Sequence, residues 1–412
     1  MTVDMTYLIV GASLAGAKAA ETLRAEGFDG RVVLIGAENE LPYERPPLSK
    51  DYLMGKSERE KIYVHPEEWY EQAGIDLRLG TLVASIDREA HDATMADGSR
   101  VGYTKLLVTT GSSPRRIQVP GAFLDGVLYL RTVEDSDRIK ALLQGASRIA
   151  VIGAGWIGLE VTAAARAAGV EVTLIEEAEL PLLRPLGPEA AQVFATLHRE
   201  HGVDLRFSAQ VAEITGASGR ATGVRLADGG HVDADAVVVA IGISPNTALA
   251  VACGLDVSNG IVTDAQLRSS DPDIYAAGDV ASALHPLVGK HIRVEHWANA
   301  LNQPQTAAKA MLGQDVSYDR VPYFFTDQYD LGMEFSGYVE PHGYEQVVFR
   351  GDVAQREFIA FWLDSGNHLL AGMNVNVWDV TDTIQALVRS GQPVDVAALR
   401  DPAIPLDSLT GR

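Results

Sequence analysis

The chain has 412 residues, of which 47% are hydrophobic, so it can bury large cores and divide into about two or three domains. Its formal net charge of −21 argues against nucleic acid or an anionic membrane surface as a partner. No apolar run approaches the ~20 residues that a membrane-spanning helix needs. The first residues, Met1-Thr2-Val3-Asp4, show neither the basic segment nor the cleavage site of a signal peptide, so we expect a cytoplasmic protein.

A glycine-rich turn lies near the start of the sequence. A short apolar strand leads into Gly11-Ala12-Ser13-Leu14-Ala15-Gly16, which is followed by an Ala-rich helix and a second strand at Val32–Ile35. This order is the fingerprint of a dinucleotide site, where backbone N–H groups and the helix N-terminus bind a pyrophosphate. Ser13 replaces the middle glycine of the fingerprint. Glu38, the candidate acid for the ribose, stands beyond the end of the second strand.

Two prolines stiffen a cationic loop further along the chain, in Arg45-Pro46-Pro47-Leu48-Ser49-Lys50. Because proline fixes the backbone, the loop holds its flanking cations rigidly, although a structural turn with solvated charges would have the same pattern. The first nucleotide unit then ends in an apolar strand, Leu106–Thr109, and a Thr110-Gly111 turn.

A second glycine-rich turn repeats the pattern in complete form. The strand Arg148–Ile152 leads into Gly153-Ala154-Gly155-Trp156-Ile157-Gly158, then a helix and the strand Val170–Ile175. Glu176 directly follows that strand, where a carboxylate can bind the adenosine ribose. This unit closes in the strand before Gly242. Two fingerprints in one chain predict two dinucleotides, and therefore a flavoenzyme that is supplied by a nicotinamide.

The later sequence predicts an interrupted domain order. Residues 273–279 form a strand that ends in a Gly-Asp turn, and they supply the final strand that the first nucleotide unit lacks. Strand-like runs follow at 346–350, 357–363 and 368–375, and a helix at 380–390. We expect an α/β fold with two Rossmann-like domains and a C-terminal α+β interface domain. The expected domains are an FAD-binding domain of residues 1–111 and 243–318, an NAD-binding domain of 112–242, and the interface domain of 319–412.

The single cysteine, Cys253, excludes a vicinal cysteine pair beside a flavin. It lies among small residues at a predicted helix end, which is typical of a buried apolar side chain. Electrons from the nicotinamide must therefore leave without protein thiols. The histidines show no metal-ligand spacing, and we expect no metal site.

The chain resembles the NADH-dependent ferredoxin reductases of oxygenase systems, which are FAD enzymes of the glutathione-reductase fold, within the pyridine nucleotide-disulfide oxidoreductase superfamily. The resemblance covers essentially the whole chain. The motifs that carry it are Gly11 to Gly16, Pro42 to Lys50, Tyr129-Leu130-Arg131-Thr132, Gly153 to Glu160, Ala277-Gly278-Asp279, Glu295-His296-Trp297-Ala298-Asn299-Ala300 and Thr326-Asp327-Gln328-Tyr329.

The resemblance implies electron transfer from NADH through FAD to a [2Fe–2S] ferredoxin, which docks transiently and supplies a cytochrome P450 or a Rieske dioxygenase. It implies that Lys50 contacts the flavin and that Glu160 supports it as a partner, so these two residues form the expected catalytic pair. It also implies that Asp279 binds the ribityl chain of FAD, that Arg131 contacts the flavin or the pyrophosphate, and that Trp297 lies at the pyrimidine end of the flavin.

The full set of residues expected to bind the two cofactors is Gly11, Ser13, Leu14, Ala15, Gly16, Glu38, Arg45, Lys50, Val83, Thr110, Gly111, Arg131, Gly153, Gly155, Trp156, Ile157, Gly158, Glu160, Glu176, Gly242, Gly278, Asp279, Glu295, His296 and Trp297. Pro304 departs from the small residue that is usual in the helix after Trp297, so we expect that helix to be shortened or kinked there.

Three alternatives stay open. A rubredoxin reductase would share nearly every motif. An NADH oxidase or peroxidase would normally carry a cysteine beside the flavin, which this chain lacks. A redox-sensing flavoprotein of the apoptosis-inducing-factor type would turn over very slowly with every carrier.

Overall fold

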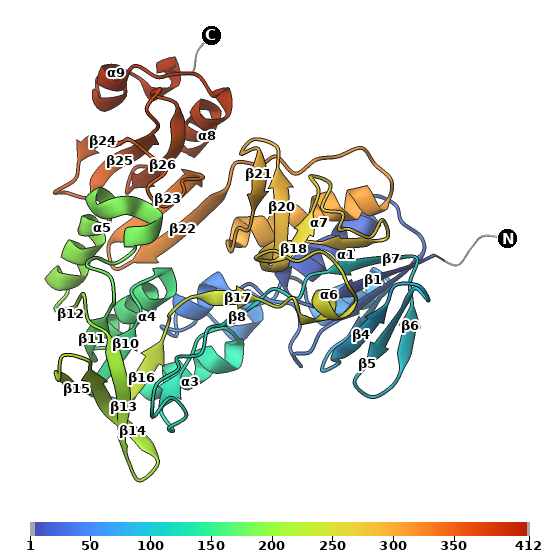
Figure 1. The fold of residues 1–412 in the computed structure, drawn as a ribbon, viewed down its shortest axis with the longest axis horizontal. Helices are drawn as coiled ribbons and strands as arrows, with labels where there is room; N and C mark the ends of the chain where they lie inside the picture. The colour runs from blue at the N-terminus through green and yellow to red at the C-terminus, as the bar shows by residue number, and fades with distance from the viewer. Residues whose placement is uncertain (1–4, 410–412) are drawn as a thin grey trace. The chain divides into compact units, whose positions relative to one another are not determined.

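The computed structural model describes residues 5–409, so the start of the chain, on which the expected cytoplasmic location rests, lies outside the described part. The chain divides into two compact units, drawn in Figure 1. Unit 1 consists of residues 1–44, 58–113 and 244–322, and unit 2 consists of 45–57, 114–243 and 323–412. These units do not coincide with the three expected domains, whose boundaries stay a prediction.

Unit 1 is built on a parallel sheet with the strand order β19-β7-β1-β2-β3. The strand after the long interruption, β19, pairs with β7 and so returns to the first sheet. Alternate residues of β1 point into two different apolar cores. Ile9 lies in one core and Leu8 in the other, and both side chains are fully buried, as in a sheet that is covered on both faces. The bounds are β1 (Thr6–Val10), β2 (Arg31–Ile35), β3 (Ile75–Arg78), β7 (Lys105–Val108) and β19 (Ile274–Ala276).

Helices α1 (Leu14–Ala25) and α7 (Trp297–Met311) pack against each other in unit 1. Helix α7 continues through Pro304, so the expectation that this proline shortens the helix is wrong. The other elements of unit 1 are α2 (Glu67–Gln72), α6 (Ala248–Ala252), the antiparallel sheet β4 (Val83–Asp87), β5 (Asp92–Met95) and β6 (Arg100–Gly102), and the sheet β18 (Ile261–Thr263), β20 (Ala281–His285) and β21 (Lys290–Ile292).

Unit 2 repeats the parallel sheet with the strand order β12-β11-β10-β16-β9. Its strands are β9 (Val127–Leu128), β10 (Arg148–Ile152), β11 (Glu171–Ile175), β12 (Asp204–Arg206) and β16 (Ala236–Val239), and its helices are α3 (Val133–Leu143), α4 (Trp156–Ala167) and α5 (Leu183–Glu200). An antiparallel sheet is formed by β13 (Val211–Ala217), β14 (Arg220–Leu226) and β15 (His231–Asp233). Strands β8 (Ser112–Pro114) and β17 (Ile243–Pro245) stand where the chain passes between the units.

The C-terminal part of unit 2 is an antiparallel sheet with the order β22-β23-β26-β25-β24, packed against two helices (Figure 1). The elements are β22 (Tyr323–Gln328), β23 (Leu331–Gly337), β24 (Gln346–Asp352), β25 (Glu357–Leu363), β26 (Leu369–Val375), α8 (Thr381–Ser390) and α9 (Val396–Arg400). One apolar core joins this sheet to the second Rossmann-like sheet, and the indole N–H of buried Trp362 donates to the Leu186 carbonyl at 3.0 Å. This shared core explains why both belong to one unit.

Within residues 5–409, no helix is both long enough and apolar enough to cross a membrane.

Candidate functional site

The first glycine turn joins β1 to α1, and backbone atoms leave no room for a side chain at two of its glycines. Gly11 has a φ of +122°, and a Cβ there would lie 2.2 Å from the Thr109 carbonyl oxygen. A Cβ on Gly16 would lie 2.0 Å from the Gly11 carbonyl oxygen. Both glycines are therefore required by the close approach of strand and helix, which brings the helix N-terminus to the end of the strand.

Ser13 occupies the N-cap position of α1 in an extended conformation, and its side chain makes no capping hydrogen bond. Leu14 and Ala15, the first residues of the helix, are buried. A Cβ on Gly278 would meet the Ala15 methyl group at 3.4 Å, so the structure brings the Ala277-Gly278-Asp279 turn to the first glycine turn. The arrangement fits a dinucleotide, because the first turn of a helix leaves unpaired N–H groups that can bind a phosphate.

Two side chains position the Gly278-Asp279 turn. The Gly278 N–H donates to the Gln303 side chain of α7 at 2.8 Å, and the Ser112 hydroxyl donates to the Asp279 carboxylate at 2.7 Å. Gln303 could not be found from the sequence, because a single glutamine in a helix carries no signal. Ser112 could have been suspected, since it follows the Thr110-Gly111 turn.

The remaining unit 1 candidates occupy different environments. The Tyr43 hydroxyl donates to the Glu38 carboxylate at 2.5 Å, which holds that acid after β2. Thr110 exchanges two hydrogen bonds with Asn246, and Gly111 adopts a φ of +64° in the same turn. Val83 is buried in the apolar core beneath the β4–β6 sheet.

The start of α7 carries the remaining three candidates of unit 1. Glu295 forms an ion pair with Arg293, whose side chain is 8% exposed, and His296 is the N-cap residue of the helix. Burial lowers the pKa of His296 to about 4, although the Asp279 charge opposes the shift, so this imidazole is neutral at physiological pH. Burial also raises the pKa of Glu44, against the effect of a hydrogen bond with Trp297.

The second glycine turn, in unit 2, matches the first in geometry. Gly153 has a φ of +100°, and a Cβ there would lie 2.4 Å from the Ala240 carbonyl oxygen. A Cβ on Gly158 would lie 2.0 Å from the Gly153 carbonyl oxygen. A Cβ on Gly155, the N-cap residue of α4, would meet no described atom within 4 Å. The outer two glycines therefore serve packing, and the middle one borders open space that suits a pyrophosphate.

Glu176 faces this turn directly. Its carboxylate accepts hydrogen bonds from the Ala154 N–H at 2.7 Å and from the Ala178 N–H at 2.9 Å. These two backbone donors hold the carboxylate beside the glycine turn, where an adenosine ribose would meet it. Three further residues were predicted to bind the nicotinamide dinucleotide at this turn. Trp156 is half-buried, Ile157 is 42% exposed, and Gly242 adopts a φ of +92° after β16.

The structure brings Lys50 and Glu160 together, although 110 positions separate them in the sequence. The Lys50 ammonium lies 2.8 Å from a carboxylate oxygen of Glu160, and their side chains are 13% and 4% exposed. The same carboxylate accepts hydrogen bonds from the Ser49 hydroxyl and, at 2.6 Å, from the Thr326 hydroxyl. Each oxygen of the carboxyl group therefore has at least one polar partner. The short proline-containing helix Pro46–Ser49, helix α4 and strand β22 supply these groups.

Strand β22 adds two further side chains around Lys50. The ammonium lies 5.4 Å from the centre of the Phe325 ring, within the range of a cation–π contact. Burial raises the pKa of the Asp327 carboxyl, and the nearby charge of Glu160 adds to the rise while Lys50 opposes it. The Lys50 cation thus contacts the Glu160 carboxylate and the Phe325 ring, and the solvent-exposed Asp327 side chain is close enough for its charge to interact with Lys50.

Arg45 and Arg131 lie together in unit 2. The Arg45 guanidinium donates to the Arg131 carbonyl, and the Arg131 N–H donates to Asp135 at 3.1 Å. The residues expected at the flavin therefore divide between the units. Arg45, Lys50 and Arg131 belong to unit 2, and the others belong to unit 1. No pattern in the sequence indicates that the proline loop belongs with the second nucleotide unit.

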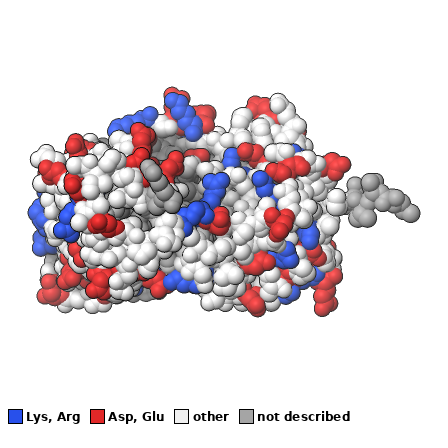
Figure 2. Space-filling view, turned by 90° about the horizontal axis from the view of Figure 1, so that it is seen from above, with Lys and Arg blue, Asp and Glu red and all other residues white. Residues whose placement is uncertain are grey.

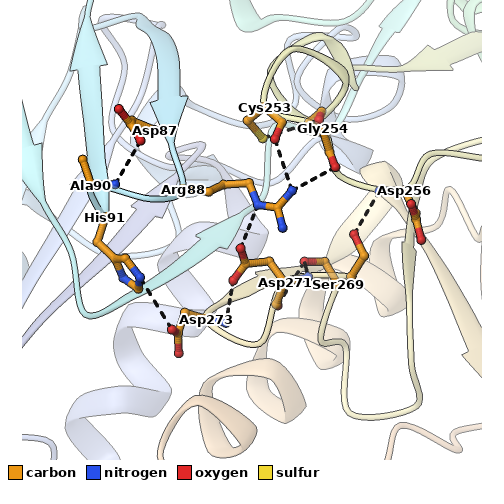
Figure 3. A network of polar contacts seen from close by, with 12 residues as sticks. Asp87, Arg88, Ala90, His91, Cys253, Gly254, Asp256, Ser269, Asp271 and Asp273 are labelled. Atoms are coloured by element: carbon orange, nitrogen blue, oxygen red, sulfur yellow. Dashed lines mark hydrogen bonds and ion pairs between the residues drawn. The ribbon is translucent and has the colours of Figure 1, made fainter.

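Cys253 is the C-cap residue of α6 in unit 1. Figure 3 shows it beside Arg88. Its carbonyl accepts a hydrogen bond from Arg88, whose guanidinium also pairs with Asp271 at 2.7 Å. The half-buried thiol packs against an apolar core, and burial raises its pKa. An apolar setting and a raised pKa make the thiol unreactive.

Charged side chains of both signs lie on the face drawn in Figure 2. Figure 2 shows Asp and Glu side chains scattered over the face in view, with Lys and Arg side chains among them. Over the described range 5–409, no group of three or more His, Cys, Asp or Glu residues is arranged to hold a metal ion.

Two Rossmann-like sheets, each with a glycine turn closed by its own backbone, define a protein that binds two dinucleotides. Residues 5–304 match the pyridine nucleotide-disulphide oxidoreductase family, and residues 323–410 match the C-terminal domain of reductases. The chain belongs to the pyridine nucleotide-disulphide oxidoreductase family, and its cofactors are FAD and NAD(H).

Two similar proteins and one solved structure match almost the whole chain. The ferredoxin–NAD(+) reductase component of an anthranilate 1,2-dioxygenase system from Burkholderia cepacia is 41% identical, over 97% of this chain and 98% of that protein. Putidaredoxin reductase of Pseudomonas putida is 36% identical, over 99% of this chain and 97% of that protein. The crystal structure of a covalent complex of putidaredoxin reductase with putidaredoxin superposes on this chain with a TM-score of 0.95 at 35% identity. The match covers 99% of this chain and 98% of the chain in that structure.

Proposed function

We propose that this protein is an NADH:ferredoxin oxidoreductase that passes electrons from NADH through FAD to a [2Fe–2S] ferredoxin. The ferredoxin docks transiently and supplies a cytochrome P450 or a dioxygenase. The observation that carries the proposal is the presence of two dinucleotide turns in a chain with a single cysteine. Similarity along the whole chain to reductases of dioxygenase systems supports it. We place the protein in the cytoplasm, where NADH is supplied.

We assign FAD to the first glycine turn and the nicotinamide dinucleotide to the second. The approach of Gly278 to Ala15 supports the first assignment, because it brings the Gly278-Asp279 turn to the helix N-terminus of the first glycine turn. The contact of Glu176 with the Ala154 N–H supports the second, because it sets an acid beside the turn. The domain boundaries and the remaining cofactor-binding residues are proposed as the sequence predicts them.

Lys50 and Glu160 are the proposed catalytic pair. When bound, FAD would supply the redox chemistry that links hydride donors to one-electron acceptors. The ammonium of Lys50 holds positive charge in a largely buried site, where it stabilises negative charge more strongly than it would in water. Glu160 fixes the position of that ammonium through their 2.8 Å contact.

The alternatives differ in their electron acceptor. A rubredoxin reductase would favour rubredoxins, an NADH oxidase would favour oxygen, and a redox-sensing flavoprotein would turn over slowly with every acceptor. A panel of purified ferredoxins and rubredoxins, tested beside oxygen by stopped-flow spectroscopy, separates these functions. We expect at least one [2Fe–2S] ferredoxin to be reduced faster than every rubredoxin and faster than oxygen. A faster rubredoxin, or oxygen as the best acceptor, would contradict the proposal.

The choice of nicotinamide should depend on Glu176. Its carboxylate can accept hydrogen bonds from both ribose hydroxyls and should repel a 2′-phosphate, although Arg184, exposed near the start of α5, could attract one. We expect kcat/KM to favour NADH over NADPH by at least about tenfold, or ~1.4 kcal/mol. Glu176→Gln should reduce this preference, as measured by steady-state kinetics with both nucleotides.

The neighbouring carboxylate provides the matched control for this prediction. Glu177 is exposed and directly follows Glu176, so Glu177→Gln removes the same charge without touching the turn. It should leave the preference for NADH intact. Equal kcat/KM values for both nucleotides in the wild-type protein would show that the role given to Glu176 is wrong.

A further inference from the structure

A chain of buried polar side chains runs from Glu160 to the end of β22. The Thr326 hydroxyl contacts the Glu160 carboxylate at 2.6 Å, and the Gln328 amide nitrogen lies 3.2 Å from the Thr326 hydroxyl. The Gln328 amide oxygen lies 2.9 Å from Nε2 of His198 on α5, and Nδ1 of His198 lies 3.3 Å from the Tyr329 hydroxyl. All five residues belong to unit 2.

These side chains are buried far more deeply than polar groups usually are. Thr326 and His198 are 0% exposed, Gln328 is 1% exposed and Glu160 is 4% exposed. Burying such groups costs free energy unless each has a hydrogen-bond partner. The chain satisfies that requirement with contacts between residues as far as 166 positions apart.

The donors and acceptors of the chain all point in one direction. The Gln328 oxygen can only accept, so Nε2 of His198 must carry the proton and donate. Nδ1 of the neutral ring then accepts from the Tyr329 hydroxyl. The Gln328 amide donates to the Thr326 oxygen, which leaves the Thr326 proton to donate to Glu160. Burial lowers the pKa of His198 to about 4, so the ring stays neutral across the physiological range.

We propose that Thr326, Gln328 and His198 are positioning residues, which orient the Glu160 carboxylate and through it the Lys50 ammonium for hydride transfer. This inference rests on the proposed function of the Lys50–Glu160 pair. Thr326 supplies the donor that fixes one carboxylate oxygen, the same oxygen that Lys50 contacts. Gln328 and His198 fix the direction in which the Thr326 hydroxyl donates.

The test replaces Thr326 with valine, which keeps its shape and removes its hydroxyl. In stopped-flow reduction of the holoenzyme by NADH, the limiting rate at saturation should fall roughly 10- to 100-fold, because small displacements of a reacting site are costly. The NADH concentration at half-saturation should change by less than about threefold. Thr326→Ser restores the hydroxyl and should recover most of the rate. Gln328→Met should lower the rate less than Thr326→Val.

Thr162 provides the matched control on α4, two positions from Glu160. It is fully buried, and its hydroxyl has no hydrogen-bond partner in the described part of the chain. Thr162→Val therefore makes the same chemical change without breaking the chain, and its limiting rate should equal that of the wild type.

A second readout does not depend on turnover. In thermal unfolding without NADH, Thr326→Val combined with Glu160→Ala should lose less than the sum of the two single losses, because each single variant already breaks the hydrogen bond that the two residues share. Additive losses would overturn the inference. So would a Thr326→Val rate within about twofold of the wild type, or a Thr326→Ser rate as low as that of valine. A wild-type flavin that NADH does not reduce would instead refute the proposed function itself, and the inference with it.

Discussion

Replacing Glu160 with alanine should lower the free energy of unfolding by about 3–5 kcal/mol, the usual cost of removing one partner of a buried ion pair. The change leaves the Lys50 ammonium, only 13% exposed, without its carboxylate, and it takes the acceptor from the Ser49 and Thr326 hydroxyls. We expect the unfolding temperature to fall by roughly 10 °C, as measured by differential scanning calorimetry. The rate of flavin reduction by NADH should fall as well, because Lys50 loses its fixed position.

Two variants show whether the ion pair causes this loss. Glu160→Gln keeps the shape of the side chain and one acceptor oxygen, so its loss of stability should lie between those of alanine and the wild type. Glu171→Ala removes an exposed carboxylate at the start of β11 and should have little effect. If Glu160→Ala were as stable as Glu171→Ala, the buried pair would not stabilise unit 2.

Replacing Gly155 with aspartate should abolish productive NADH binding and leave the fold intact. A Cβ at this position meets no described atom within 4 Å, and the backbone is extended, with φ −78° and ψ −178°. Aspartate is a favourable N-cap residue, so the helix keeps or gains stability. Its charge, however, would stand where the pyrophosphate binds. We expect the Kd for NADH to rise at least about 100-fold, or ~2.7 kcal/mol, in an anaerobic titration of the holoenzyme.

Gly158→Ala is a comparison variant that should change the packing of strand against helix and not the binding of NADH. Its Cβ would lie 2.0 Å from the Gly153 carbonyl oxygen, so strand and helix must separate. We expect a loss of about 1–3 kcal/mol in the free energy of unfolding, as for other overpacked cores. The two glycines should thus separate binding from stability. Unchanged NADH affinity in Gly155→Asp would remove the second turn as the nicotinamide site.

The Rossmann-like sheets could be predicted from the sequence because their signals are local. Each glycine turn, its strands and its acid lie within about 40 residues, in the span of one βαβ unit. The return of β19 to the first sheet was also predictable, since Ile274–Ala276 is a short apolar strand that ends at a glycine. In contrast, β23 was not predicted, and Pro304 was expected to interrupt α7, which continues through it.

The candidate site was less accessible to sequence reasoning because its contacts join distant positions. From the sequence pattern alone, Glu160 would be a solvent-exposed residue of the helix after Gly158. Only the family resemblance linked it to Lys50. Thr326 and Gln328 belong to a motif that carried the resemblance, but nothing in their spacing pointed to Glu160 or to His198. A histidine inside a helix gives no sign of burial, and the hydrogen-bond chain emerges only when β22, α4 and α5 are folded together.

The most direct test of the central claim compares the wild-type protein with Cys253→Ser in NADH-dependent reduction of a [2Fe–2S] ferredoxin. Cytochrome c serves as the final acceptor, and the rates with and without ferredoxin are measured under the same conditions. We expect a strong dependence on ferredoxin and rates for the two proteins that agree within about twofold, because no thiol lies on the electron path. Loss of turnover in Cys253→Ser, or faster transfer to oxygen than to any ferredoxin, would contradict this account.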